Sequence, residues 1–301
     1  MDTFDNLLQG RSPAFLNLLR TARIAAKTDV SLLLSGENGT GKELLAQAIH
    51  QESTRHGHAF IAVNCLTFAD MHEPLPVRIK AAEGGSLFLN EVDKLPFTMQ
   101  TRLLHFLETG ECHLPGKTGP AQVDTRILAA SSTDLQQAVR NGDFNKKLFY
   151  RLNIVPLQVP ALRERHGDIK LLINSLNQEL ARQHGLDAPH YSNETMKQLQ
   201  QYDWPGNTRE LRNFCERMLI LLAGQTINIT NLPQDIMTQS HPVTTDNGFT
   251  LPDGGIVLEE LEADLIHQAL DKCQGNQSKA ARLLGLTRSA LLYRMKKHAI
   301  A

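Results

Sequence analysis

The sequence predicts an α/β protein whose parallel sheet is followed by two smaller all-α units. Up to about residue 170, short apolar runs alternate with helical patterns. This alternation is typical of buried parallel strands joined by helices. After residue 171 the spacing of apolar residues is helical and no convincing strand is found.

Five runs are short and apolar enough to be the strands of this sheet. They are VSLLLSG (30–36), AFIAVN (59–64), SLFLN (86–90), TRILAAS (125–131) and IVPLQV (154–159). The expected domains are an α/β unit at 1–170, a helical lid at 171–237 and an all-α unit at 258–301. Residues 238–257 contain Pro, Gly, Thr and Asp without a period, which predicts a linker.

Composition argues against a membrane-spanning protein, and the distribution of charge distinguishes the end of the chain. Hydrophobic residues are 41% of the 301, and no apolar run reaches the roughly 18 residues that a membrane span needs. The four cysteines are scattered, as expected for reduced thiols in a cytoplasmic protein. The net charge is −1, yet residues 275–301 hold six basic residues and no acidic one. This basic end favours a nucleic-acid-binding module.

A glycine-rich turn follows the first predicted strand and opens a helix. GENGTGKE (36–43) fits the pattern of a phosphate-binding loop, except that Glu43 takes the place of the usual hydroxyl residue. Backbone N–H groups of such a loop surround phosphate oxygens, and the lysine reaches the outer phosphates. The predicted nucleotide-binding residues are Gly36, Glu37, Asn38, Gly39, Thr40, Gly41, Lys42 and Glu43.

The third predicted strand, SLFLN (86–90), runs into polar residues and so begins the stretch SLFLNEVD (86–93). Many nucleotide hydrolases end a buried strand in two carboxylates, which hold the metal and polarise water. Here Asn90 takes the first position and Glu91 the second. An uncharged amide binds Mg²⁺ more weakly than a carboxylate does, so a weakened magnesium site is expected.

Six stretches in their order resemble the AAA+ activators of sigma-54 RNA polymerase, the bacterial enhancer-binding proteins. They are LLLSGENGTGKELLAQAIH, FIAVNC, GGSLFLNEVDKLP, FYRLNIVPL, ALRERHGDI and WPGNTRELRN. The resemblance implies an AAA+ core with a helical lid, bound ATP and Mg²⁺, and a ring with nucleotide between subunits. We expect no receiver or sensor domain before this core.

The resemblance also implies roles for single residues. Lys42 matches the phosphate-binding lysine, and Glu91 matches the glutamate that orients the attacking water. Asn64 matches the asparagine that restrains this glutamate, and Arg209 matches the nucleotide-sensing arginine of the lid. Arg151 matches one of two arginines offered to the neighbouring subunit's ATP, where an arginine stabilises developing charge.

Three departures from the family pattern fall at positions that the resemblance assigns to ATP hydrolysis. Besides Asn90, Ser132 stands where an asparagine senses the γ-phosphate, and Asn145 stands where the second trans arginine belongs. Ser132 is still counted among the residues that line the nucleotide. Together these departures predict a weakened ATPase.

The long loop with a GAFTGA tip, through which the family touches sigma-54, is not recognisable here. The interval LTFADMHEPLPVRIKAAEGG has no glycine from Thr67 to Glu83, and Phe68 is its single aromatic residue. Pro74 and Pro76 disfavour a regular hairpin. We interpret the interval as a deletion of the loop, with VRIKAAEGG as a returning strand or helix.

The C-terminal residues resemble the Fis-type helix-turn-helix of the same family. Gly285 is the predicted turn, and Thr287 the predicted N-cap of the last helix, 288–298. Helical spacing is found at Leu258, Leu261, Leu265, Ile266, Ala269 and Leu270. In the last helix, inward packing is expected of Leu291, Leu292 and Met295. The predicted DNA contacts are Arg288, Ser289, Tyr293, Arg294, Lys296 and Lys297.

The sequence therefore predicts a DNA-binding transcription regulator with an ATP-binding core that does not activate sigma-54 polymerase by itself. The alternative is a competent ATPase that remodels the polymerase, in a mixed ring with a partner that carries the loop. A chaperone-like AAA+ protein is disfavoured by the C-terminal helices. Expected partners are double-stranded DNA, RNA polymerase with its sigma class left open, and copies of this chain as a dimer or ring.

Overall fold

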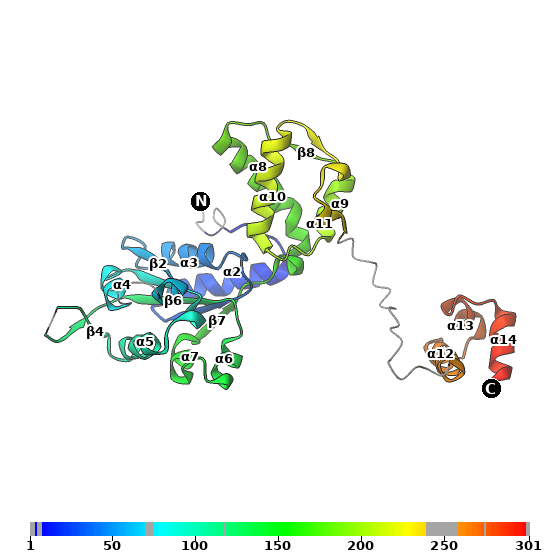
Figure 1. Ribbon diagram of the computed structural model, residues 1–301, viewed down its shortest axis with the longest axis horizontal. Coiled ribbons are helices and arrows are strands. Elements are labelled where there is room, and N and C mark those ends of the chain that lie inside the picture. Colours follow the sequence, from blue (N-terminus) through cyan, green and yellow to red (C-terminus); the bar gives the residue numbers. More distant parts are fainter. Residues whose placement is uncertain are drawn as a thin grey trace. The chain divides into compact units, whose positions relative to one another are not determined.

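The computed structural model describes Phe4 and residues 8–69, 75–116, 118–238, 258–273 and 275–298. The chain forms two compact units, Met1–Pro242 and Val243–Ala301. The first holds the sheet and the lid (Figure 1), and the second holds three helices. The predicted linker at 238–257 lies, apart from Thr238, outside the described residues.

A five-stranded parallel sheet in the order β2-β3-β6-β1-β7 forms the centre of the first unit. Its strands are β1 (Leu32–Ser35), β2 (Phe60–Asn64), β3 (Ser86–Asn90), β6 (Arg126–Ser131) and β7 (Val155–Gln158). All five predicted strands are therefore confirmed. Because the strands are parallel, the residues that end β1, β2, β3 and β6 meet at one edge of the sheet.

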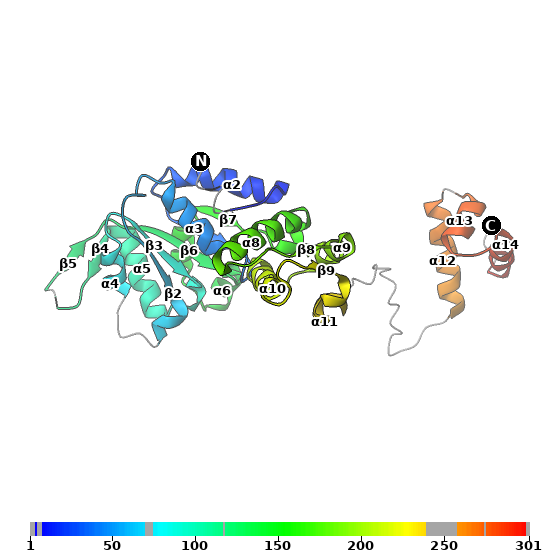
Figure 2. The same ribbon diagram turned by 90° about the horizontal axis from the view of Figure 1, so that it is seen from above.

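Helices cover both faces of the sheet, which explains why its strands are apolar on both sides. Leu32 and Leu34 pack in one core with α2 (Pro13–Ala26) and α3 (Lys42–Gln51), whereas Leu33 packs in the other. The helices of this other face are α4 (Leu75–Ala81), α5 (Phe97–Thr109), α6 (Leu135–Asn141) and α7 (Lys146–Leu152). Figure 2 shows α2 and α3 on one side of the sheet and α4 and α5 on the other.

The interval between β2 and β3 contains a 3₁₀ turn, η1 (Cys65–Ala69), and the helix α4. Among its described residues there is no strand, and VRIKAAEGG contributes to a helix. Residues 70–74, which include Pro74, lie outside the described part. The sequence did not predict the hairpin of β4 (Glu111–His113) and β5 (Pro120–Gln122).

The lid is helical, as predicted, around a core that includes Trp204. Its elements are η3 (Leu162–Asp168), α8 (Ile169–His184), α9 (Asn193–Gln201), α10 (Asn207–Leu222), η4 (Ile229–Asn231) and α11 (Gln234–Thr238). The expectation that this region has no strand was wrong. The two-residue strands β8 (His190–Tyr191) and β9 (Thr226–Ile227) pair in parallel, too short for periodicity to reveal them.

The C-terminal unit folds around a small core of its own. Its helices are α12 (Leu258–Lys272), α13 (Gln277–Leu283) and α14 (Arg288–Lys297). Ile266, Ala269, Leu291 and Met295 are buried, and Leu270 packs against them. The prediction that Leu292 packs inward was wrong, because this residue is 41% exposed. Leu265, which lies at helical spacing on α12, is 45% exposed. The side chains of Leu258 and Leu261 lie outside the described part.

The turn between α13 and α14 has the predicted chemistry. Gly285 adopts φ +67°, a left-handed conformation that glycine takes without steric cost. The Thr287 hydroxyl accepts a hydrogen bond of 3.3 Å from the Ala290 N–H and so caps α14.

Candidate nucleotide site and nucleic-acid interface

The phosphate loop joins β1 to α3 and has the backbone that its glycines permit. Gly36, Gly39 and Gly41 adopt positive φ angles of 153°, 79° and 97°. The Thr40 side chain is buried, and its hydroxyl donates to the Glu37 carbonyl over 2.8 Å. The loop therefore keeps a curled form in which its N–H groups and the start of α3 can surround an anion.

Lys42 is the first residue of α3 and is only 6% exposed. Its ammonium group donates to the carbonyls of Gly36 and Glu37, over 2.8 and 3.1 Å. Burial lowers the pKa of Lys42, and the nearby Glu91 carboxylate opposes this shift. The positive charge thus lies over the mouth of the loop, and the next residue, Glu43, is exposed and lines the same cavity.

The lid closes against the loop from the other side. A Cβ atom on Gly39 would lie 2.2 Å from the carbonyl oxygen of Gly206, so only glycine fits there. Thr208 donates its hydroxyl to the Gly39 carbonyl, and the backbone N–H of Arg209 donates to the same oxygen over 3.3 Å. These contacts bring Arg209, predicted from the resemblance alone, to the wall of the loop cavity.

The end of β3 brings Asn90 and Glu91 to the same cavity. Glu91 is 8% exposed and adopts a left-handed φ of 55°, a strained conformation for a non-glycine residue. The Ser132 hydroxyl donates to the Glu91 carboxylate over 2.5 Å. Ser132 is therefore a direct partner of Glu91, a contact that the sequence did not reveal.

Asn64 ends the neighbouring strand β2, directly beside Asn90 in the sheet register. It is exposed, and its side-chain oxygen accepts from the backbone N–H of Leu66 over 3.0 Å. The predicted restraint of Glu91 by Asn64 stays a prediction, because in this structure the glutamate is held by Ser132.

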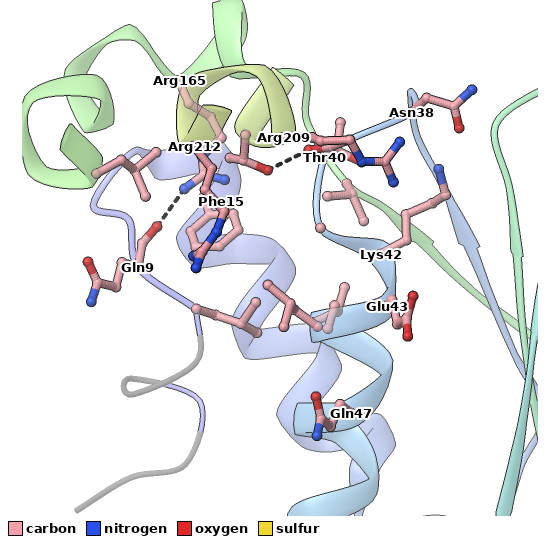
Figure 3. A pocket seen from close by; sticks show the side chains of 18 of the residues that line it. Gln9, Phe15, Asn38, Thr40, Lys42, Glu43, Gln47, Arg165, Arg209 and Arg212 are labelled. Atoms are coloured by element: carbon pink, nitrogen blue, oxygen red, sulfur yellow. Dashed lines mark hydrogen bonds between the residues drawn. The ribbon is translucent and has the colours of Figure 1, made fainter. Parts of the chain in front are cut away.

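The cavity measures about 460 Å³ and extends from the loop to a second, mainly apolar end (Figure 3). The sequence did not predict this end, where the wall consists of Leu8, Phe15, Leu18, Leu172 and Leu176. Three separate segments supply these residues, and no local pattern marks them. A cavity of this size, with phosphate-binding groups at one end and apolar walls at the other, suits a nucleotide.

A buried ion pair fixes the apolar end. Arg165 is 3% exposed, bonds Asp168 over 3.0 Å and donates to the Gln9 carbonyl over 2.7 Å. Its guanidinium carbon lies 3.5 Å from the centre of the Phe15 ring. Although burial of Asp168 opposes ionisation, the Arg11 N–H and the Arg165 guanidinium lower its pKa. This pair ties the N-terminal segment to the lid, as Figure 3 shows for Gln9 and Arg165.

Comparison with known families gives three consecutive matches. The family described as Sigma-54 interaction domain matches residues 8–75 and 67–158. An AAA+ ATPase lid domain matches residues 163–248, and the Fis family of bacterial regulatory proteins matches residues 257–298. The chain belongs to the sigma-54 interaction domain family.

Relatives and solved structures agree with this assignment. The transcriptional regulatory protein XylR of Pseudomonas putida is 37% identical over 96% of this chain and 56% of its own length. ZraR of Escherichia coli K12 is 35% identical over 96% of the chain and 68% of its own length. NtrX of Brucella abortus, solved with ADP, matches with a TM-score of 0.71 and 31% identity, covering 99% of this chain and 70% of its own.

The chain thus spans little more than half the length of XylR. The predicted AAA+ fold with its helical lid and helix-turn-helix is confirmed by these matches and by the sheet. None of the helices in the described residues is long and apolar enough to cross a membrane.

The two positions at which the resemblance predicts trans arginines, Asn145 and Arg151, lie at the start of α7 and within it, and neither lines the loop cavity. The guanidinium of Arg151 donates to the Leu107 carbonyl over 3.0 and 3.3 Å and borders an open surface hollow with Tyr150 and Lys147. Asn145 is the N-cap of α7 and accepts from the N–H groups of Lys147 and Leu148. Its amide therefore serves the helix end, a role that arginine could not fill.

The described residues contain no cluster of three or more His, Cys, Asp or Glu side chains placed to share a metal ion. At the end of β3, a magnesium ion that arrives with a nucleotide would find the carboxylate of Glu91 and the amide oxygen of Asn90, and the carboxylate of Glu43 also lines the cavity. At this strand end an amide fits the ion less well than a second carboxylate would, because Mg²⁺ prefers anionic oxygen. The glycine cradle and Lys42, by contrast, fit a phosphate chain.

The predicted DNA-contacting residues of α14 differ in their surroundings. Arg288, Ser289, Tyr293 and Lys296 are exposed on the helix. Arg294 instead pairs with Glu262 of α12, whose carboxylate also accepts from His298 over 2.9 Å. Lys297 lies 3.9 Å from the same carboxylate. Glu262 therefore draws the last turn of α14 toward α12, and Arg288 and Lys296 remain exposed on the helix.

Proposed function

We propose that this protein is a DNA-bound transcription regulator whose AAA+ core binds ATP, hydrolyses it slowly and does not activate sigma-54 polymerase by itself. The observation that carries the proposal is the contrast inside one cavity. The glycines of the phosphate loop and Lys42 are in place, whereas the strand end beside them offers Asn90 in place of a carboxylate.

Hydrolysis would depend on few groups of this chain. Glu91 would orient the attacking water, and Lys42 and Arg209 would stabilise charge on the phosphates. The Ser132 hydroxyl occupies one oxygen of Glu91, which leaves that oxygen less available to a water molecule. Arg151 of a neighbouring copy would supply a single arginine in trans. Bound ATP with Mg²⁺ supplies the phosphoryl group and its charge neutralisation.

The interval between β2 and β3 supports the second half of the proposal. Its described residues form a short turn and the helix α4 rather than an extended loop. The family match is also divided into two segments that overlap at residues 67–75, where such a loop would begin. A chain without this loop lacks the segment that the family uses to touch sigma-54.

The helix-turn-helix supports DNA binding, and the resemblance implies a site with two-fold character, because the first helix of such domains commonly pairs with that of a second copy. The N-terminal turn of α14 would enter the major groove, with Arg288 and Ser289 nearest the base edges and Lys296 nearer the phosphates. RNA polymerase would be the partner at the promoter.

Open-complex formation on a sigma-54 promoter tests the proposal. Purified full-length chain, holoenzyme, ATP and Mg²⁺ are expected to give no opening above the level without the protein. A loop-bearing family member serves as the positive control. Opening by this chain alone would contradict the proposal. Opening only when the two proteins are mixed, beyond what the control gives alone, would support the alternative of a mixed ring.

A further inference from the structure

We propose that Asn207 couples the lid to the phosphate loop, so that the loop keeps its anion-binding form only while the lid is docked on it. The inference deepens the proposed nucleotide binding and rests on it for its ligand. Asn207 acts as a positioning residue, because its contacts are to the loop backbone and to Glu37.

Asn207 is the first residue of α10 and is completely buried. Its side-chain oxygen accepts from the Leu162 N–H over 2.7 Å, which fixes the orientation of the amide. The amide nitrogen then donates to the Asn38 carbonyl over 3.0 Å and to the Glu37 carboxylate over 3.1 Å. A buried asparagine with both ends of its amide bonded is oriented in one way only.

The backbone at this position also points to a specific role. Asn207 adopts a left-handed φ of 53°. Asparagine tolerates this conformation better than most residues, yet glycine would adopt it without strain. The turn therefore retains an asparagine where backbone geometry alone would favour glycine, which indicates that the amide is needed.

Glu37 connects the loop to a second point of the lid. Its carboxylate pairs with the guanidinium of Arg163, which donates over 2.8 Å through Nη1. The hydrogen bonds from Arg163 and Asn207 lower the pKa of Glu37 to about 2. The carboxylate is thus ionised and accepts from two lid residues that are 44 positions apart in the sequence.

These contacts determine the direction of the loop N–H groups. A trans peptide unit is planar, so its C=O and N–H point to opposite sides. When the Asn38 carbonyl points at Asn207, the Gly39 N–H must point away from the lid turn. The Gly39 carbonyl points at Thr208 and the Arg209 N–H, so the Thr40 N–H points away as well. Loss of the Asn207 amide would free the first of these peptide units to rotate.

Four variants of the full chain test this coupling. Asn207→Asp removes the donor and places a negative charge beside Glu37. Glu37→Gln in the same chain removes the repulsion and lets the new glutamine donate to the new aspartate, while the Asn38 carbonyl stays without its donor. Asn207→Gly removes the amide without charge and relieves the left-handed backbone. Asn213→Asp is the matched control, because Asn213 is exposed on the same helix and its substitution adds the same negative charge.

Two measurements are made on each variant: hydrogen exchange of residues 37–42 without nucleotide, and affinity for a fluorescent ADP analogue. Asn207→Asp and Asn207→Gly are expected to accelerate exchange in the loop. They should lower the affinity for the analogue about tenfold, the size expected when two hydrogen bonds that hold the loop are lost. The double variant should recover only the part of the loss that repulsion causes and should then resemble Asn207→Gly, because an aspartate at position 207 still cannot donate to the Asn38 carbonyl. General destabilisation would not give this partial recovery.

Exchange and affinity of Asn207→Asp and Asn207→Gly equal to those of Asn213→Asp would overturn the inference. A double variant that behaves like the parent chain would overturn it as well, because the Asn38 carbonyl would then need no partner in the lid. If no form of the chain, including the parent, binds the analogue, the proposed nucleotide binding fails. The exchange of the loop still decides the coupling in that case, since it needs no nucleotide.

Discussion

The phosphate loop and the end of β3 face the same cavity, yet they differ in how well they suit nucleotide chemistry. The loop has its glycines, its lysine over the mouth and a lid turn that locks two of its carbonyls. The strand end has an amide at Asn90 and a glutamate bonded to Ser132. The difference teaches that binding and turnover rest on separate groups, so one can weaken while the other stays.

Lys42→Ala makes the largest expected change, because it removes the ammonium group that lies over the loop. Nucleotide binding should fall below detection in a titration with a fluorescent ATP analogue. Lys27→Ala is the control, since Lys27 is an exposed lysine at the end of α2. If Lys42→Ala keeps its affinity for the analogue, the claim that the phosphate loop binds nucleotide through Lys42 is wrong.

Arg288→Ala tests the unit at the other end of the chain. An exposed arginine at the first turn of α14 is placed to reach base edges, and its loss should cost about 1–3 kcal/mol of specific binding. Preference at one base pair should relax at the same time. The measurement is binding of the full chain to specific and scrambled duplexes. Equal losses on both duplexes would reduce Arg288 to a phosphate contact.

Asn90→Asp tests the claim that the end of β3 is poorly suited to hydrolysis. A carboxylate at the end of β3 should bind Mg²⁺ more tightly and raise magnesium-dependent turnover several-fold, while the affinity for ATP in EDTA stays unchanged. Turnover is followed across a magnesium titration. Unchanged turnover would indicate that the proposed defect lies at Ser132 or Asn145 instead, and Ser132→Asn would then be the informative variant.

Arg294→Ala should have the smallest effect on DNA, although this arginine belongs to the same basic helix as Lys296. Its guanidinium is paired with Glu262, whereas Lys296 is exposed. Lys296→Ala should reduce the slope of log affinity against log salt by about one. Arg294→Ala should leave this slope nearly unchanged. Equal changes in slope would show that Arg294 leaves Glu262 to reach a phosphate.

The sequence predicted the sheet because its strands are short, apolar and separated by helical patterns. It predicted the phosphate loop because the function of such a loop is local: glycines, a lysine and a helix start follow one another directly. The turn of the helix-turn-helix was predictable for the same reason, since Gly285 and Thr287 each act within a few residues.

The contacts that the sequence missed join residues far apart in the chain. Ser132 reaches Glu91 across two strands, Glu262 takes Arg294 away from the exposed face, and Leu8, Phe15 and Leu176 meet only because the lid closes on α2. Leu292 was expected inside because it is apolar, yet three short helices have too small an interior to bury it.

The separation of binding from hydrolysis is tested most directly by an ATP titration in which bound nucleotide and released phosphate are measured on the same sample of full-length protein. We predict saturable binding that depends on Lys42, together with turnover far below the enzyme median of about 10 per second. Turnover near that median at saturating ATP and Mg²⁺ would contradict the account, because Asn90 and the Ser132–Glu91 contact would then impose no defect.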